Sequence, residues 1–336
     1  MTDQHVIGLV GFFGWGNFGD ELFVEAHRRF LGHLGELRPV NDLTRKPYFS
    51  EPVEMALSGY DAFVIGGGDL VVPWTASDLY WKPEFLERPV FLTGVGVPQW
   101  QDPRPRAMQI YRNFMQSDQL RMIIARDNPS CVWIKNRIQP NVEPVWHPDL
   151  VCALDFPAVE KPAAGRKILG VALRKRPDRK DDFSAVRAMC ERAKRMGYDI
   201  RLIVLGTGQV GEADFEVAKD FAASGEEIVY SEDLWELCAA IGQCTQLATM
   251  KFHGTVVASM YGVPSIAMAP TDKNRHFLRM LDRFDQKCAF GNDKLPEMIV
   301  ENPEPIPEET IAKLRDGARA GYSKLARGLE AALASS

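Results

Sequence analysis

Short apolar runs alternate along the chain with stretches whose apolar residues recur at helical spacing. After the first run, residues 6–10, a helical face is predicted by four apolar residues: Phe23, Ala26, Phe30 and Leu34. Further strands are predicted at residues 37–40, 62–65, 90–93, 122–125 and 142–146. An alternation of strand and helix is typical of a parallel sheet that is covered by helices on both faces.

The alternation pauses once, near the middle of the chain. Residues 156–167 contain Pro157, Pro162 and Gly165, and we predict a linker there. The pattern then resumes, with strands predicted at residues 168–173, 200–205, 228–230, 247–250 and 265–269. The predicted fold is therefore α/β, with two doubly wound, Rossmann-like domains facing a cleft. We assign them to residues 1–155 and 166–306, followed by a C-terminal helix within 307–336.

Composition limits the class of protein. The chain has 336 residues, of which 46% are hydrophobic and 25% charged, as in an ordinary globular protein. A net charge of −5 argues against a nucleic-acid partner. Six cysteines without a C-x-x-C pair indicate a reducing compartment. The start of the chain lacks a signal-peptide pattern, and no apolar run is long enough to span a membrane, so we predict a cytoplasmic protein.

The most informative short segment is residues 251–255, KFHGT, which lies between a predicted strand and a predicted helix of small residues. The first N–H groups of a helix have no internal partner, and the helix dipole is positive there. Lys251 and His253 add to that character, with Gly254 and Thr255 in the same turn. The segment predicts an anion site. The alternative is a buried polar turn with a satisfied histidine.

A glycine-rich turn at residues 11–21 follows the first predicted strand. Trp15 lies there without an obvious core to fill, and Gly16, Asn17 and Asp20 line the same turn. The glycine spacing also matches a dinucleotide fingerprint, but no acidic residue convincingly ends the second strand. A tight turn capped by Asp20 is the structural alternative.

Two later strands also end in glycines, at residues 66–68 and 94–96. Consecutive glycines are tolerated where the backbone must approach something closely. Gly68 and Asp69 are therefore candidates for a ligand crevice. Trp74 follows nearby, and an aromatic ring in such a place suits the C–H face of a sugar. Ordinary packing of a large side chain is the alternative.

Charged residues follow other predicted strands: Arg126, Asp149, Arg174 and Lys273. Arg126 is suited to a carboxylate or phosphate, or to a structural pair with Asp127. Arg174 is suited to an anion in the cleft, or belongs to a solvated basic loop. Their shared position matters, because ligands of open α/β sheets bind beyond the carboxyl ends of the strands.

Taken together, these motifs resemble the polysaccharide pyruvyl transferases over roughly residues 6–280. The matching motifs, in order, are residues 14–21 (GWGNFGDE), 66–68, 94–96, Arg126-Asp127 with Ser130, Pro148-Asp149, Arg174, residues 251–253, 262–264 (GVP) and Lys273. One departure is that Lys251 stands where the family usually has Arg. Lysine keeps the charge but loses the bidentate fork.

The resemblance implies a two-domain fold like that of GT-B glycosyltransferases. It also implies transfer of pyruvate from phosphoenolpyruvate to two hydroxyls of a sugar, forming a cyclic ketal and releasing phosphate. We expect His253 as the acid and Asp20 or Asp149 as the base. The expected donor-binding residues are Arg174, Lys251, Gly254, Thr255, Lys273 and Arg126. The expected acceptor-binding residues are Gly16, Asn17, Trp15, Gly68, Asp69 and Trp74. We expect no metal and no cofactor.

Other functions remain open at this point. A GT-B glycosyltransferase would use a nucleotide sugar, yet residues 251–264 contain no carboxylate to hold one. A non-catalytic carbohydrate-binding relative and, more distantly, a dehydrogenase are further alternatives. The expected partners are phosphoenolpyruvate and a sugar or lipid-linked oligosaccharide acceptor, with no nucleic acid. Peripheral association with the inner face of the membrane and the oligomeric state are left open.

Overall fold

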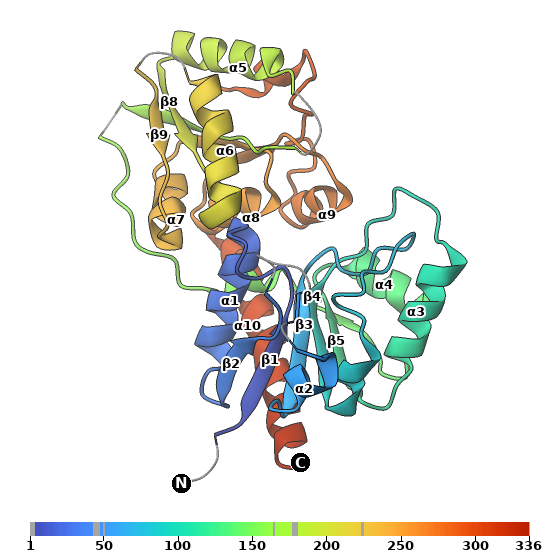
Figure 1. Cartoon of the computed structure of the whole chain (residues 1–336). Helices are drawn as coiled ribbons and strands as arrows, with labels where there is room; N and C mark the ends of the chain where they lie inside the picture. The colour runs from blue at the N-terminus through green and yellow to red at the C-terminus, as the bar shows by residue number, and fades with distance from the viewer. Residues whose placement is uncertain are drawn as a thin grey trace. The chain divides into compact units, whose positions relative to one another are not determined.

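The computed structural model describes residues 4–42, 48–49, 51–163, 165–176, 181–222 and 225–335. Contacts between residues divide the chain into two units. Unit 1 comprises Met1–Trp15, Asp20–Leu154 and Leu314–Ser336, and unit 2 comprises Gly16–Gly19 and Asp155–Lys313. Each unit is a parallel sheet with helices packed on it, which confirms the predicted α/β class (Figure 1).

The described strands of unit 1 form one parallel sheet in the order β2-β1-β3-β4-β5-β6. Their bounds are β1 Val6–Val10, β2 Glu36–Pro39, β3 Ala62–Gly68, β4 Val90–Val95, β5 Leu120–Ala125 and β6 Val145–Trp146. The strand predicted at residues 142–146 is therefore shorter than expected. The chain winds outward from β1 to β2 and from β3 toward β6, so the switch point of the sheet lies between β1 and β3.

The helices of unit 1 are α1 Phe18–Leu31, α2 Val53–Leu57, α3 Pro105–Met115, α4 Asn128–Arg137, the short 3₁₀ helices η1 Pro83–Glu87 and η2 Leu150–Ala153, and most of α10 Glu308–Leu333. On one face of the sheet, α10 packs beside α1, where the rings of Phe30 and Tyr322 stack with centroids 4.5 Å apart. At Gly328 of α10 a Cβ would stand only 2.9 Å from Met122 and 3.0 Å from Phe91. The absence of a side chain thus lets α10 lie close against β4 and β5.

The other face of the unit 1 sheet is covered by α3. Tyr111 and Phe114 of this helix belong to one buried cluster with Leu92 and Ile123 of the sheet. Leu92 and Ile123 come directly after Phe91 and Met122, which face α10. Successive side chains of a strand point to opposite faces, so Leu92 and Ile123 face α3. β3 and β4 are buried almost throughout, as expected of strands with helices on both sides.

The described strands of unit 2 form a second parallel sheet, in the order β11-β10-β7-β8-β9. Their bounds are β7 Lys167–Ala172, β8 Tyr198–Ile203, β9 Glu227–Val229, β10 Gln246–Thr249 and β11 Ser265–Ala267. The helices are α5 Ser184–Arg195, α6 Gly208–Phe221, α7 Leu234–Gly242, α8 Phe252–Met260, α9 Asp272–Met280 and η3 Leu295–Met298. The order is that of a doubly wound Rossmann sheet without its sixth strand, with the switch point between β7 and β10. In the part of the chain that is described, no helix has both the length and the apolar character needed to cross a membrane.

Candidate functional site

The switch point of unit 2 is formed by the carboxyl ends of β7 and β10. Lys251 follows β10 and is the N-cap residue of α8, in an extended backbone conformation and without a side-chain capping bond. The hydroxyl of Thr249 fixes this turn, because it accepts the Lys251 N–H and donates to the Lys251 carbonyl, both at 3.0 Å. The predicted strand-to-helix turn is therefore present. The first N–H groups of α8 lie at the carboxyl ends of the strands, where open α/β sheets bind ligands.

Of the nine residues of α8, all except His253 are buried. Gly254 is packed tightly: a Cβ there would stand 2.5 Å from Thr249 Oγ1 and 2.8 Å from Leu205 Cδ1. Thr255 is fully buried as well. Gly254 and Thr255 therefore form the inner side of the turn, and His253 is the α8 side chain that remains accessible to a ligand.

Lys251 is buried and forms an ion pair. Its Nζ lies 2.5 Å from Asp214 Oδ2 and donates to the Leu205 carbonyl at 2.7 Å. The other oxygen of Asp214 accepts the Lys175 N–H at 2.6 Å. Asp214 thus links α6 to the ends of β7 and β10. We predicted Lys251 as a donor-binding residue, and in the structure a carboxylate from α6 balances its charge.

The sequence interpretation missed Asp214, although a signal for it exists. It stands three residues after Gly211 and four before Ala218, both buried, so it lies on the apolar face of α6. An aspartate on such a face needs a buried partner, because an uncompensated charge is costly away from water. Spacing along a helix shows that a partner is required, but not that the partner is Lys251.

Two other predicted donor residues also lie at this edge of unit 2. Lys273, in the first turn of α9, has its Nζ 5.6 Å from the centroid of the Phe252 ring. The His253 ring lies 4.9 Å from that same ring, so both polar side chains lie near Phe252. Arg174 follows β7, which pairs with β10, and its exposed side chain lines a pocket with Phe183 of the loop before α5 and Phe221 of α6. The structure therefore brings Lys273 and His253 together beside the first turn of α8.

Part of the first glycine-rich turn also packs in unit 2. The carbonyl of Gly16 accepts the Thr207 N–H at 2.8 Å, and Asn17 pairs with Gly206 as an isolated antiparallel bridge. A Cβ on Gly19 would stand 1.7 Å from His253 Nδ1. The backbone of Gly16 and Asn17, which we predicted as acceptor-binding residues, lies against the turn after β8, and Gly19 leaves room for the His253 ring.

A Gly19→Ala protein should lose roughly 10²-fold in turnover, because the added methyl displaces the His253 ring and a misplacement of about 1 Å costs that much. Gly19 does not have a positive φ, so alanine fits the backbone and the effect reports on space alone. The measurement is kcat together with the free energy of unfolding. Gly59→Ala is the matched control, because its Cβ meets open space. Wild-type turnover in Gly19→Ala would contradict the assigned contact.

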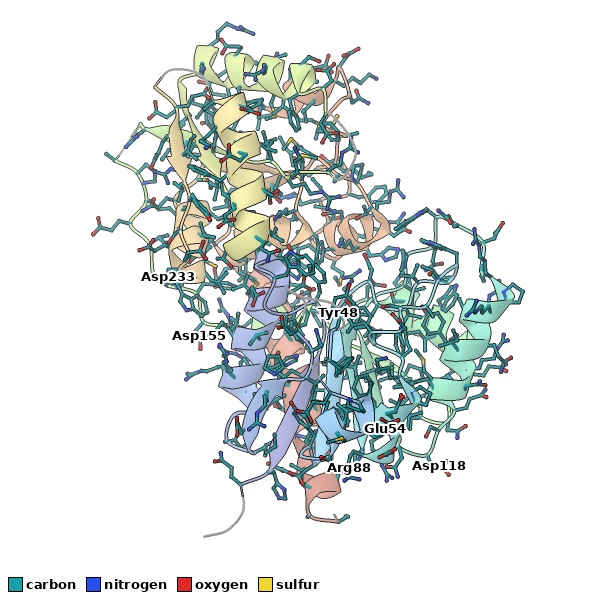
Figure 2. All side chains as sticks on the ribbon, viewed as in Figure 1. Tyr48, Glu54, Arg88, Asp118, Asp155 and Asp233 are labelled. Carbon is teal, nitrogen blue, oxygen red and sulfur yellow. The ribbon has the colours of Figure 1, made fainter. Side chains whose placement is uncertain are left out.

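The switch point of unit 1 brings together Asp20, Gly68 and Tyr80. Asp20 is buried, and a Cβ on Gly68 would lie 3.8 Å from its Oδ1. Gly68 has φ +100°, a conformation that favours glycine. Burial, and secondly the Asp20 carboxylate, raises the pKa of Tyr80 well above its usual value, so its hydroxyl stays protonated. Tyr48 lies toward the carboxyl ends of the unit 1 strands, and Arg88 lies toward their amino ends (Figure 2).

Arg126 is buried in a cluster of carboxylates within unit 1. Its guanidinium contacts Asp69, and its Nε lies 3.8 Å from Asp127 Oδ2. Burial by itself lowers the pKa of Arg126, but the carboxylates of Asp69, Asp127 and Asp149 raise it overall. Asp149 Oδ1 also accepts the Val151 N–H at 3.1 Å and so caps η2. We predicted that Arg126 binds the donor; the geometry favours a role in holding Asp69.

The two tryptophans predicted at the acceptor side have different surroundings. Trp15 is half-buried and stacks on Phe12, with ring centroids 5.4 Å apart and an angle of 11° between the planes. Trp74 lies 4.8 Å from Trp100 in a tilted arrangement, and 58% of Trp100 is exposed. Trp15 is thus part of the packing of its turn, whereas Trp74 borders a separate cavity of unit 1.

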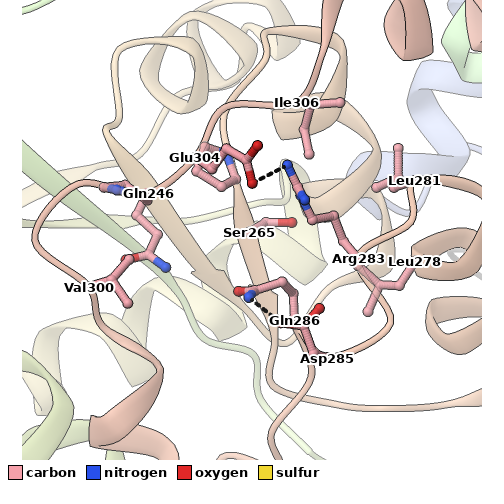
Figure 3. Close-up of a pocket in the computed structure, with 12 residues that line it drawn as sticks. Gln246, Ser265, Leu278, Leu281, Arg283, Asp285, Gln286, Val300, Glu304 and Ile306 are labelled. Carbon is pink, nitrogen blue, oxygen red and sulfur yellow. Dashed lines mark hydrogen bonds and ion pairs between the residues drawn. The ribbon is translucent and has the colours of Figure 1, made fainter.

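A small cavity of about 130 Å³ in unit 2 lies at the amino ends of β10 and β11, away from the turn that carries His253 (Figure 3). Gln246 and Ser265, the first residues of β10 and β11, line it, and Arg283 pairs with Glu304 beside them at 3.0 Å. His253 follows the opposite, carboxyl end of β10. Among the described residues, no group of three or more His, Cys, Asp or Glu side chains is arranged to hold a metal ion.

Comparison with solved structures shows the fold. The chain is similar to UDP-N-acetylglucosamine 2-epimerase from Rickettsia bellii, with a TM-score of 0.58 and 10% identity over 98% of this chain and 97% of that one. It is similar to S. aureus MnaA in a co-structure with UDP (TM-score 0.55, 11% identity, 96% and 97% covered). It is also similar to the glycotransferase of kitacinnamycin (TM-score 0.56, 13% identity, 98% and 99% covered). The predicted GT-B-like fold is confirmed.

Comparison of the sequence shows the family. No curated protein matches the chain. The sequence model of the polysaccharide pyruvyl transferases matches residues 17–272, a region that runs from the glycine-rich turn to the start of α9 and includes Lys251 and His253. The predicted resemblance is confirmed, and the chain belongs to the polysaccharide pyruvyl transferase family.

Proposed function

We propose that this transferase moves pyruvate from phosphoenolpyruvate onto two hydroxyls of a sugar in a polysaccharide or its precursor, forming a cyclic ketal and releasing phosphate. Family membership supports a transferase with a sugar or polysaccharide acceptor. The observation that carries the donor assignment is the N-terminus of α8, where His253 is the residue of the helix that is not buried and the Lys273 ammonium lies near the ring of Phe252.

The donor would be held by a positive helix end rather than by Lys251. Phosphoenolpyruvate carries a carboxylate and a phosphate, and both are suited to the first N–H groups of α8 together with Lys273 and Arg174. Lys251 contributes indirectly, because its pair with Asp214 ties the turn to α6. Gly254 and Thr255 contribute as the close-packed inner side of that turn.

In the proposed reaction, His253 gives a proton to the methylene carbon of phosphoenolpyruvate, and the adjacent carbon becomes electrophilic. One sugar hydroxyl adds to that carbon and loses its proton to a base. The second hydroxyl then displaces phosphate, which leaves with the electron pair of the C–O bond. The proton of this hydroxyl restores His253, the proton held by the base passes to the released phosphate, and the ketal is complete. Asp20 and Asp149 are the two candidates for the base, and Asp149 also caps η2. No metal or cofactor takes part in the proposal.

Phosphoenolpyruvate should raise the melting temperature of the protein more than UDP or GDP does at equal concentration. A ligand stabilises the folded state in proportion to RT ln(1 + [L]/Kd), so the ranking of shifts reports the ranking of affinities. UDP is a fair comparator because it is the ligand named for one structure with this fold. Equal or larger shifts with UDP or GDP would favour the nucleotide-sugar glycosyltransferase.

The decisive experiment incubates the protein with phosphoenolpyruvate and a panel of pyranosides. Phosphate release together with a ketal product detected by mass spectrometry is the expected result. Turnover of a nucleotide sugar without ketal formation would overturn the proposal in favour of a glycosyltransferase. Binding of sugars with no turnover of either donor would indicate a carbohydrate-binding relative without catalysis.

A further inference from the structure

A cavity of about 640 Å³ lies in unit 1, away from the strand ends that carry Asp20, Gly68 and Asp69. It is enclosed by η1, by α3 and by the loop that contains Trp74 and Asp78. A volume of this size lies within the range of small-molecule sites. Of the residues predicted to bind donor or acceptor, Trp74 lines it, whereas His253, Lys273, Asp20 and Asp69 do not.

The inner wall of this cavity is aromatic. Trp81 lines the cavity and is held edge-on between Tyr111 and Phe114, at centroid distances of 5.1 Å and 5.2 Å. Only 4% of Trp81 is exposed, and within the described structure its indole N–H has no acceptor. Buried indole N–H groups normally find an acceptor. The indole N–H is closed off from the cavity, so Trp81 contributes an apolar inner wall and not a hydrogen bond.

The rim of the cavity is positive. Arg104 and Arg106 line it, and both are exposed at the start of α3, where Arg104 is the N-cap residue and Pro105 follows. The first turn of α3 contains no acidic residue, and no side chain caps it. Within the described residues, neither arginine side chain forms an ion pair or hydrogen bond. Two guanidinium groups at a helix N-terminus are suited to a carboxylate.

We propose that this cavity is a secondary subsite that binds a carboxylate-bearing sugar residue of a glycan chain. The ring of Trp74 suits sugar C–H groups, and Ser77, Asp78 and Asn113 add hydrogen-bonding groups of the kind that sugar hydroxyls need. The two arginines select the carboxylate. A purely apolar lipid would leave the arginines without partners.

This inference rests on the proposed function for its biological meaning. Each completed ketal carries the carboxylate of pyruvate, so a chain that has already been modified bears the group that the arginines recognise. The subsite would then hold a modified or otherwise acidic segment of the chain while another segment reacts. Occupation of the subsite is expected to favour acidic chains over single neutral sugars.

The test is calorimetric binding of trigalacturonate, an acidic oligosaccharide, and of maltotriose, its neutral counterpart, to the full-length protein. We expect trigalacturonate to bind and maltotriose to bind at least tenfold more weakly. The double variant Arg104→Gln/Arg106→Gln should weaken trigalacturonate binding at least tenfold, whereas Arg29→Gln, an exposed arginine of α1, should not.

Three outcomes would overturn the subsite: equal binding of the two trisaccharides, unchanged binding in the arginine double variant, or binding of a polyprenyl phosphate at this cavity with no binding of trigalacturonate. Phosphoenolpyruvate turnover on a single neutral sugar should be unchanged in the arginine double variant. If the wild-type protein shows no phosphoenolpyruvate turnover but binds trigalacturonate as described, the proposed function fails and the subsite stands.

Discussion

A His253→Gln protein should keep its fold and lose turnover by a factor of roughly 10²–10⁴, the usual contribution of general acid catalysis. His253 is the α8 residue that is not buried, so glutamine replaces it without opening a cavity in the core. Donor affinity should fall little, because the helix N-terminus and Lys273 remain. The measurement is a single-turnover rate with phosphoenolpyruvate, taken on samples whose free energy of unfolding is also determined.

His33→Gln is the matched control, because His33 is an exposed histidine near Glu330 in unit 1 and has no role in the site. Its turnover should equal that of the wild type. A structural role for His253 makes the opposite forecast: His253→Gln would lower stability and leave the specific activity of the folded fraction intact. Wild-type turnover in His253→Gln would end the catalytic assignment.

Asp214→Asn should destabilise the protein by about 3–5 kcal/mol, since it removes one partner of a buried ion pair and leaves the Lys251 charge uncompensated. Only 9% of the Lys251 side chain and 4% of the Asp214 side chain are exposed, so water cannot substitute for the lost carboxylate. The substitution also weakens the contact between Asp214 and the Lys175 N–H. The measurement is the free energy of unfolding from denaturant titration.

Glu309→Gln is the control for this second prediction. It removes the carboxylate from a pair with Lys313 on α10 in which both side chains are largely exposed. Surface pairs of this kind contribute little, so no measurable loss of stability is expected. An Asp214→Asn protein as stable as the wild type would mean that Lys251 finds its compensation elsewhere, and the ion pair would lose its assigned role.

The fold class was predictable because the strands of this chain are short continuous apolar runs, whereas its helices have apolar residues at helical spacing. Residues 6–10 and 62–65 read as buried strands, and both are strands of the sheet. The order of strands within each sheet was not predictable in this way. Pairing of β10 with β7 joins segments far apart in the sequence, and no local pattern records such a partner.

The candidate site was predictable where it depends on local geometry. The turn at Lys251 and His253 follows from a strand that runs into a helix, and the structure has that turn. The burial of Lys251 was not predictable, because it depends on Asp214 from another helix. Arg126 is a similar case: the sequence shows a cation at a strand end, but its contact with Asp69 is made across the sheet.

Unit 1 is not contiguous in the chain. Tyr322 and Gly328 of the last helix, α10, pack against the rest of unit 1. In the sequence, most of unit 2 stands between α10 and the other residues of unit 1. During synthesis on the ribosome, residues up to Leu154 therefore emerge without the helix that covers one face of their sheet. Domains tend to fold as they are made. Here the unit that begins the chain is completed only after unit 2 has been synthesised, and the part of the sheet that α10 covers, at β4 and β5, stays uncovered in the interval.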